Sequence, residues 1–392
     1  MSVARVDTGA ITANVRDFIR HIPETTRFGA VVKADGYGHG AVTSARAALA
    51  GGASWLMVAT VDEAAELRAA GVAATSVPIL VLSPTAAGEA PRIVRLGLRA
   101  MVASLDGIAA LAAAAMAAGL PPPAVHVKVD TGLGRYGVAA ADAVAFVRAA
   151  RAHGGVAVEG IATHFATADQ PDDPFMHTQA ARFAAIVGSL EREGIRPPLA
   201  HAANSGATLQ GVAPWELVRV GVALYGIPPD AATPLPFALR PALSVVSRVA
   251  RLFVVQPGES VGYGRTFVAQ RPTRVALVPL GYADGLPRAL SNRGALLVRG
   301  RRCPIIGRVS MDQCTIALPD DLDISLEEPV VIVGTSCGTT QSLDNIATAA
   351  GTIAYEVATR FSARLRREEE EPDAAEAEMR LTPRPPSLRG RE

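Results

Sequence analysis

The stretch FGAVVKADGYGHG (residues 28–40) joins a short apolar run to a polar loop that is rich in glycine. Its first part predicts a strand over 30–35 that is buried on both faces, because such strands read as continuous hydrophobic residues. Lys33 lies at the end of the apolar run. A lysine there is either a solvated strand end or an amine held in a site, and the rest of the chain distinguishes between the two.

Seven further runs of this kind follow, with helical segments between them. Thr60 and Glu63 form a capping box before one helix, and Gly71 suits the left-handed residue that ends it. The eight strand–helix repeats predict an α/β fold with an N-terminal (β/α)8 TIM-type barrel over 1–238. The eight runs are 30–35, 53–59, 78–82, 99–104, 125–130, 158–165, 199–204 and 218–226.

The character of the sequence changes after Leu239. Valine-rich runs broken by glycine and proline replace the helical patterns until about 342–350. This change predicts a C-terminal mainly-β domain over 239–365, with which the first few residues of the chain are expected to pair. Residues 366–392 are charged and contain several prolines, so we expect a disordered tail.

The composition argues against several classes of partner. The formal net charge is +1 and no basic stripe precedes the tail, so nucleic acid is not expected as a partner. The apolar runs are too short to span a bilayer, so no membrane association is expected. Three cysteines without paired spacing, Cys303, Cys314 and Cys337, fit a reducing compartment such as the cytoplasm. No metal site is predicted.

Chemically useful side chains follow the strands at the carboxyl-terminal face of the predicted barrel, where barrel enzymes place their active sites. The loops after strands seven and eight commonly form a phosphate site. A phosphate site beside a lysine indicates pyridoxal phosphate, which binds lysine as a Schiff base. A sugar-phosphate enzyme with a Schiff-base lysine is the alternative. The residues at these strand ends are Lys33, Lys128, Asp130, Arg135, His164, Asn204, Ser205, Gly206, Arg219 and Gly221.

Nine ordered motifs across both predicted domains give a more specific interpretation. Together they resemble the alanine racemases, pyridoxal phosphate enzymes of fold type III, from about residue 6 to residue 360. After that point many family members have a short strand with proline and aromatic residues, whereas this chain continues with FSARL and a long tail. The motifs are VVKADGYGHG, HVKVDTGLGRYG, ATHFATAD, HAANSGA, VRVGVALYG, VGYGRTF, GYADGLPR, GRVSMDQ and GTIAYEVATR.

The resemblance implies two catalytic residues. Lys33 would be the Schiff-base lysine and the base on one face of the substrate. Tyr263 would be the opposing base, contributed by the partner subunit of a head-to-tail homodimer with shared active sites. Racemisation removes a proton on one side of a planar centre and delivers one on the other, so a second proton-transfer group is chemically required.

Four more residues are implied to surround the cofactor ring. Arg219 resembles the residue that donates to the pyridine nitrogen. Because a guanidinium only donates, it should keep that nitrogen unprotonated and disfavour transamination and decarboxylation. His164 would brace Arg219. Arg135 matches the arginine that contacts the cofactor's phenolic oxygen and the substrate carboxylate, and Lys128 matches a position that is often carbamylated.

The remaining implied roles are those of ligands. Met311 would donate its backbone N–H to the substrate carboxylate, Tyr282 would line the entrance, and Asp312 would orient its neighbours. The residues implied to bind the cofactor, mainly its phosphate, are Tyr37, Asn204, Ser205, Gly221, Val222 and Tyr355.

These implications predict an isomerase that interconverts L-alanine and D-alanine by a two-base mechanism and supplies D-alanine for cell-wall peptidoglycan. Three alternatives stay open. One is a racemase of serine or of broader specificity. Another is a decarboxylase of the same fold type, against which Arg219 argues because such enzymes usually place a carboxylate at the pyridine nitrogen. The last is a non-catalytic pyridoxal phosphate carrier, which is typically a barrel alone.

Overall fold

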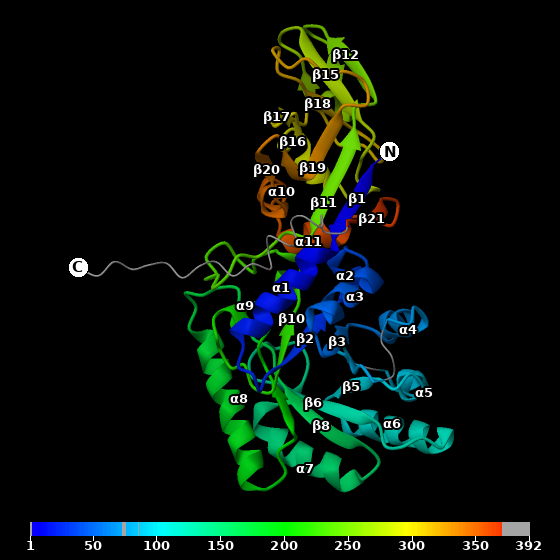
Figure 1. The fold of residues 1–392 in the computed structure, drawn as a ribbon, viewed down its shortest axis with the longest axis vertical. Helices are drawn as coiled ribbons and strands as arrows, with labels where there is room; N and C mark the ends of the chain where they lie inside the picture. The colour runs from blue at the N-terminus through cyan, green and yellow to red at the C-terminus, as the bar shows by residue number, and fades with distance from the viewer. Residues whose placement is uncertain (1, 73–75, 85, 371–392) are drawn as a thin grey trace, which may run out of the picture.

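The computed structural model describes residues 2–72, 76–84 and 86–370, and it has two bodies along its long axis (Figure 1). One is a barrel of parallel strands covered by helices, and the other is built mainly of β-strands. The first strand, β1 (Val3–Asp7), pairs with β11 (Leu243–Arg248) of the second body, and α1 (Thr8–His21) then leads into the barrel. The predicted fold class is therefore confirmed.

The barrel is nearly closed. Within the described residues, eight parallel strands follow one another in the order β10-β2-β3-β4-β5-β6-β8-β9, and the short β7 (Val138–Ala139) pairs with β6. At the remaining seam the Arg219 N–H donates to the Ala203 carbonyl at 2.9 Å. The strands are β2 (Arg27–Val31), β3 (Trp55–Val58), β4 (Ile79–Val81), β5 (Arg99–Val102), β6 (Ala124–Asp130), β8 (Ala157–Ala162), β9 (Leu199–His201) and β10 (Leu217–Val220).

Seven of the eight predicted strands end earlier than the sequence suggested, and two of them differ most. The strand predicted over 30–35 ends at Val31, and a left-handed turn labelled α2 (Lys33–Tyr37) follows it. The strand predicted over 218–226 ends at Val220, and the 3₁₀ turn η3 (Val222–Tyr225) takes its place. Small and apolar residues continue beyond Val220, and one more valine follows Val31, so hydrophobicity alone cannot locate either end.

The helices around the barrel carry the expected stop signals. Thr60 and Glu63 form the predicted capping box, and Gly71 has a positive φ of 63°. The helix α6 begins after its cap Ser104 and ends at the left-handed Gly119. The barrel helices after α1 are α3 (Ala41–Gly51), α4 (Val61–Ala69), α5 (Ala90–Arg95), α6 (Leu105–Ala118), α7 (Ala143–His153), α8 (Phe175–Arg192) and α9 (Ser205–Leu209), with the 3₁₀ turns η1 (Ala87–Glu89) and η2 (Ala140–Asp142).

The second body contains three sheets. The largest has the order β17-β16-β19-β11-β1-β21, a second has the order β12-β15-β18, and β13 pairs with β14. Two helices, α10 (Leu343–Ala350) and α11 (Ala354–Arg360), connect this body to the barrel side (Figure 1). The further elements are β12 (Arg251–Val255), β13 (Ser260–Val261), η4 (Tyr263–Arg265), β14 (Phe267–Val268), β15 (Thr273–Val278), η5 (Arg288–Leu290), β16 (Ala295–Val298), β17 (Arg301–Pro304), β18 (Cys314–Ala317), β19 (Pro329–Ser336), β20 (Thr339–Gln341) and β21 (Arg366–Glu370).

The last described strand corrects the prediction of a disordered tail over 366–392. Residues 366–370 form β21, which pairs in parallel with β1 at the edge of the large sheet. Arg5 forms ion pairs with Glu368 and Glu370, so the charged composition that suggested disorder instead supports pairing. The rest of the predicted tail, 371–392, lies outside the described residues.

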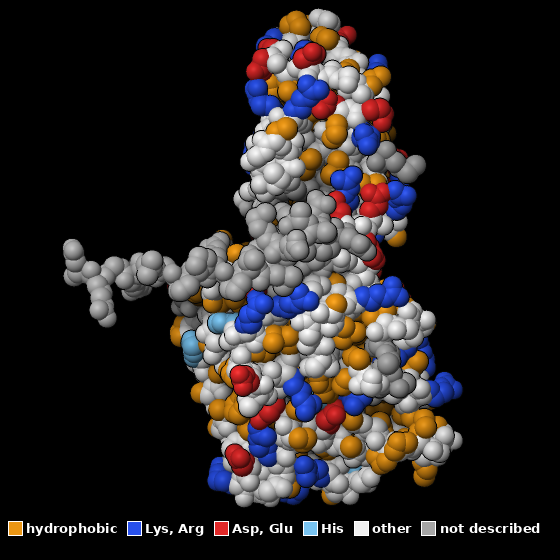
Figure 2. All heavy atoms as spheres, in the orientation of Figure 1, with side chains coloured by type: hydrophobic (Ala, Val, Ile, Leu, Met, Phe, Trp, Pro, Cys, Tyr) orange, Lys and Arg blue, Asp and Glu red, His pale blue; other side chains and the backbone are white. Residues whose placement is uncertain are grey.

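The surface in view has no single-sign region. Lys and Arg side chains are interspersed with Asp and Glu over both bodies (Figure 2). Across 2–72, 76–84 and 86–370, no helix combines the length and the apolar character needed to cross a bilayer.

Candidate active site

The carboxyl-terminal ends of the barrel strands open into a cavity of about 850 Å³, a size typical of small-molecule sites. Residues from the barrel loops form most of its lining, and α11 contributes Tyr355 from the other body. The structure thus brings together eleven of the predicted site residues. They are Lys33, Tyr37, Lys128, Arg135, His164, Asn204, Ser205, Arg219, Gly221, Val222 and Tyr355.

The backbone after Lys33 turns with left-handed geometry. Ala34, Asp35 and Tyr37 have φ values of 53°, 52° and 52°, a conformation that costs non-glycine residues about 1–2 kcal/mol each. The Ala34 N–H donates to Glu63 Oε1 at 2.7 Å, and the Asp35 carboxylate accepts the Ala41 N–H at 2.8 Å. These bonds hold the turn that aims Lys33 and Tyr37 into the cavity.

The environment of Lys33 favours its neutral amine. Burial lowers the pKa of Lys33, the positive charges of Arg135 and Arg219 lower it further, and the Glu63 carboxylate opposes them. A larger neutral fraction makes the lysine both a better nucleophile toward a carbonyl group and a better proton acceptor.

Arg219 is buried and held by four acceptors. Its guanidinium donates to the carbonyls of Thr163 at 2.9 Å and Ala202 at 2.8 Å, and it contacts His164 Nδ1 at 3.1 Å and His201 Nδ1 at 3.0 Å. Burial and the charge of Arg219 lower the pKa of both histidines well below its ordinary value, so neutral rings accept these bonds. The expected contact between His164 and Arg219 is present, whereas His201 was not predicted.

Lys128 lies near the end of β6, and Arg135 lies on the loop that follows this strand. The Asp130 carboxylate accepts the N–H groups of Gly132 at 2.8 Å and Gly134 at 2.9 Å and so shapes the turn before Arg135. Burial, followed by the charges of Arg219 and Arg135, lowers the pKa of Lys128 to about 7. A buried amine that is about half neutral at pH 7 can react with carbon dioxide through its neutral form, which a fully protonated lysine cannot.

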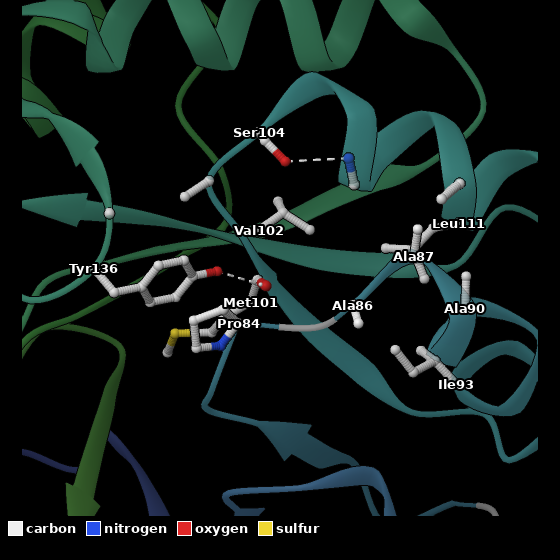
Figure 3. A pocket seen from close by; sticks show the side chains of 14 residues that line it. Pro84, Ala86, Ala87, Ala90, Ile93, Met101, Val102, Ser104, Leu111 and Tyr136 are labelled. Atoms are coloured by element: carbon white, nitrogen blue, oxygen red, sulfur yellow. Dashed lines mark hydrogen bonds between the residues drawn. The ribbon is translucent and has the colours of Figure 1, made fainter.

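Tyr136, the residue after Arg135, anchors the loop that follows β6. The Tyr136 hydroxyl donates to the Met101 carbonyl at 3.0 Å (Figure 3). Beyond Tyr136 lies a second, apolar hollow between β5, α5 and α6, to which Ile93 and Leu111 contribute (Figure 3). Tyr136 therefore separates the main cavity from this hollow and limits the movement of Arg135.

One wall of the cavity is shaped for an anion. Ser205 Oγ accepts the Gly221 N–H at 3.0 Å and the Ala223 N–H at 3.4 Å. A Cβ at Gly221 would lie 2.5 Å from the Tyr37 hydroxyl, so only glycine leaves this space open. Burial raises the pKa of Tyr37 to about 12, and its hydroxyl stays a donor. Hydroxyl and backbone N–H donors around an open glycine fit a phosphate group.

Two predicted ligands in this wall have other bonds in the described structure. Asn204 caps α9, with its Oδ1 accepting the Ala207 N–H at 3.1 Å. The Tyr355 hydroxyl donates to the Pro229 carbonyl at 3.4 Å, a long bond that a better acceptor could replace.

Four predicted residues lie on the second body and outside the cavity. Tyr263, Met311 and Tyr282 are 73%, 52% and 43% exposed, and none of the three lines the cavity of its own chain. Asp312 forms an ion pair with Arg364 at 2.8 Å. One chain by itself therefore does not bring these side chains to Lys33.

The chain matches known proteins along most of its length. Residues 6–229 match the alanine racemase N-terminal domain and 242–369 the alanine racemase C-terminal domain. It is 42% identical to the alanine racemase of Symbiobacterium thermophilum over 93% of this chain and 96% of that protein. It is 40% identical to that of Mycobacterium tuberculosis, covering 94% and 95%.

Solved structures agree with these matches. The alanine racemase of E. faecalis superposes with a TM-score of 0.87 at 40% identity, covering 94% of this chain and 98% of that one. The alanine racemase from Bartonella henselae with covalently bound pyridoxal phosphate has a TM-score of 0.83 at 28% identity, covering 94% and 99%.

The fold and the cavity define a barrel enzyme that presents a lysine with a lowered pKa beside a wall of hydroxyl and backbone N–H groups. Within that class, the matches to both domains and to close relatives are decisive. The chain belongs to the alanine racemase family. The resemblance inferred from the nine sequence motifs is thus confirmed.

Proposed function

We propose that this chain interconverts L-alanine and D-alanine with pyridoxal phosphate held at the barrel mouth. The observation that carries this proposal is the joining of Lys33, Arg219 and the wall around Gly221 in one cavity of a chain that belongs to this family. The product fits use in cell-wall peptidoglycan, and the cytoplasm fits the three unpaired cysteines.

Different residues of the cavity would bind different parts of the cofactor. Lys33 would bind it covalently, and the hydroxyl and backbone donors of Tyr37, Ser205, Gly221 and Val222 would bind its phosphate, together with Tyr355. His164 and Asn204 would keep the neighbouring loops in place. When bound, pyridoxal phosphate withdraws electrons from the amino-acid Cα and makes its proton more acidic.

Arg219 controls which reaction follows. It only donates hydrogen bonds, so facing the ring nitrogen it would keep that nitrogen unprotonated and limit electron withdrawal. This property disfavours decarboxylation and transamination. The second body, which carries Tyr263, argues in the same way against a carrier that consists of a barrel alone.

Two groups would move the proton at Cα. Lys33 Nζ would accept it as the neutral amine or donate it as the ammonium on one face, and the Tyr263 oxygen would accept it as the phenolate or donate it as the phenol on the other. Arg135 and the Met311 N–H would hold the substrate carboxylate, Tyr282 would border the entrance, and Asp312 would help to orient this edge through Arg364. A carbamate on Lys128 would give Arg135 an anionic partner.

The exposure of Tyr263 supports a head-to-tail homodimer. Because Tyr263, Tyr282 and Met311 lie on the surface of their own chain, a second copy must bring them to Lys33 if they act there. In such a dimer, residues 1–238 would form the cofactor-binding barrel, and residues 239–365 would form the domain that contributes side chains to the partner's site.

Mixing two inactive variants tests the shared site. Lys33→Ala and Tyr263→Phe chains would be unfolded, mixed and refolded together. A mixed dimer contains one site with both residues intact, so random assortment should restore about a quarter of wild-type activity. The same variants refolded separately are the control. No recovery in verified mixed dimers, or full activity of a verified wild-type monomer, would contradict the shared site.

A chiral assay with a panel of amino acids tests the substrate. We expect alanine to be racemised fastest, with added pyridoxal phosphate restoring any activity lost on dialysis. Faster conversion of serine would support the broader racemase, and release of carbon dioxide from lysine, ornithine or arginine would support the decarboxylase. Bound cofactor without turnover would support the carrier.

A further inference from the structure

A chain of hydrogen bonds runs from Arg219 through the interior of the barrel. His201 Nδ1 lies 3.0 Å from Arg219 Nη1, and His201 Nε2 lies 2.7 Å from His126 Nδ1. His126 Nε2 then lies 3.2 Å from Glu159 Oε2, which the Arg99 Nε–H contacts at 3.3 Å. Both histidines are fully buried. Glu159 and Arg99 lie near the starts of β8 and β5, at the end of the barrel opposite the cavity.

The direction of every bond in this chain follows from Arg219. A guanidinium only donates, so His201 Nδ1 must accept and the proton of this neutral ring is on Nε2. His201 Nε2–H then donates to His126 Nδ1, which places the His126 proton on Nε2. That proton points at Glu159, and a carboxylate is the acceptor that this arrangement needs.

The charges favour the same arrangement. Among the ion pairs of the described residues, none includes Arg219, so the relay links this buried cation to a carboxylate that does not touch it. The hydrogen bond from His126 and the nearby Arg99 lower the pKa of Glu159, although burial opposes them. Glu159 therefore stays ionised and can polarise both imidazoles toward itself.

The packing around His126 leaves little freedom for a different geometry. A Cβ on Gly160 would lie 2.2 Å from His126 Nδ1, so the absence of a side chain there lets the ring reach His201. The Trp55 ring packs edge-on against His126 with centroids 5.5 Å apart, and Arg99 lies over Trp55 at 5.7 Å. The relay is thus fixed by its neighbours as well as by its own bonds.

We propose that Glu159 is a positioning residue for Arg219, acting across the barrel through His126 and His201. It fixes the tautomers of both histidines, which in turn fix the plane in which the guanidinium donates into the cavity. No proton has to leave any of these groups. This inference rests on the proposed role of Arg219 toward the cofactor ring and adds a residue that lies outside the cavity.

Glu159→Gln tests the proposal, with Glu216→Gln as a matched control. Glu216 is another carboxylate at the amino-terminal end of the barrel, 35% exposed against 25% for Glu159. It pairs with Arg196 and accepts the Ala200 N–H, and within the described residues it has no hydrogen bond to His126 or His201. Both substitutions remove one charge and keep the side-chain size.

Nitrogen-15 NMR of the histidine side chains gives a readout that is independent of turnover. The chain has seven histidines, so His126 and His201 can be assigned by single substitution. We expect both rings of the full-length protein, with and without cofactor, to be neutral and protonated at Nε2. In Glu159→Gln the His126 Nε2–H resonance should move upfield and kcat for alanine should fall about tenfold, since small misplacements of a catalytic group are costly. KM should change less than twofold.

The outcomes separate the proposal from its rivals. Glu216→Gln should leave both the histidine signals and kcat as in the wild type. A proton on Nδ1 of His201 in the wild-type protein overturns the relay even if the variant does not fold. A change in the NMR signals without a change in kcat, or the reverse, overturns the positioning role. Failure of the wild type to racemise alanine refutes the proposed function and leaves the tautomers measurable.

Discussion

The barrel mouth and the exposed face of the second body differ in how complete they are within one chain. Arg219 is only 5% exposed and has its acceptors in place, and Lys33 is aimed by a turn that Glu63 supports. Tyr263, by contrast, stands largely in solvent. The difference indicates that folding of one chain completes the barrel mouth, whereas the proposed second proton-transfer group would reach it only when two chains meet.

The largest loss of activity should come from a substitution at the barrel mouth, the part of the site that one chain completes. Lys33→Ala removes both the proposed covalent attachment point and one proposed base, so we expect kcat to fall about 10⁴-fold or more. The visible absorbance of covalently attached cofactor should disappear with it. Spectra of the purified variant with added pyridoxal phosphate check this, and near-wild-type turnover would show that another amine serves the site.

Tyr263→Phe should affect the proton transfer that is proposed to depend on the partner subunit. Loss of the hydroxyl should slow racemisation about 10²–10⁴-fold while the cofactor spectrum stays unchanged. Exchange of the Cα proton with D₂O should persist for the one enantiomer whose proton faces Lys33. Measuring exchange and inversion separately checks this, and normal racemisation would remove Tyr263 from the mechanism.

Arg367 connects the barrel to the second body, because its guanidinium lies between the turn that follows Lys33 and the segment 361–365. It donates to the Gly38 carbonyl at 3.0 Å and to those of Leu365 and Phe361 at 2.9 and 2.6 Å. Arg367→Ala leaves these acceptors without a charged donor, so the free energy of unfolding should fall by about 2–3 kcal/mol.

The neighbouring Arg366 in the same strand provides the control for that change. Its side chain is 74% exposed, and within the described residues it forms an ion pair only with Glu368. Arg366→Ala should therefore change the free energy of unfolding by about 0.5 kcal/mol or less. Denaturant titrations at one protein concentration compare the two, and equal losses would show that Arg367 does not secure the junction.

The sequence predicts the eight barrel strands and most of the cavity lining because both depend on local patterns. Lys33 and Arg219 could be found since each follows or ends an apolar run at the same face of the barrel. The left-handed turn at Ala34 depends on Glu63, 29 residues away, and no local pattern reports that contact. The bond between His126 and His201 spans 75 residues, and only the closed barrel brings the two rings together.

Lys128 gives the most direct measure of how strongly the barrel mouth disfavours charge. Burial, Arg219 and Arg135 lower its pKa to about 7 from 10.5 in a solvated lysine. Between these values the unfolded chain binds a proton that the folded chain does not. The free energy of unfolding should therefore rise with pH, by up to about 1.4 kcal/mol per pH unit.

Lys128→Met lacks this titrating group and tests the argument. The free energy of unfolding of the wild type, minus that of Lys128→Met, should increase from pH 7 to pH 9 in buffer free of carbon dioxide. Added bicarbonate should stabilise the wild type further and leave Lys128→Met unchanged if a carbamate forms. Parallel pH profiles of the two proteins would show that Lys128 keeps its proton in the folded state, and the barrel mouth would then need an anion that one chain does not supply.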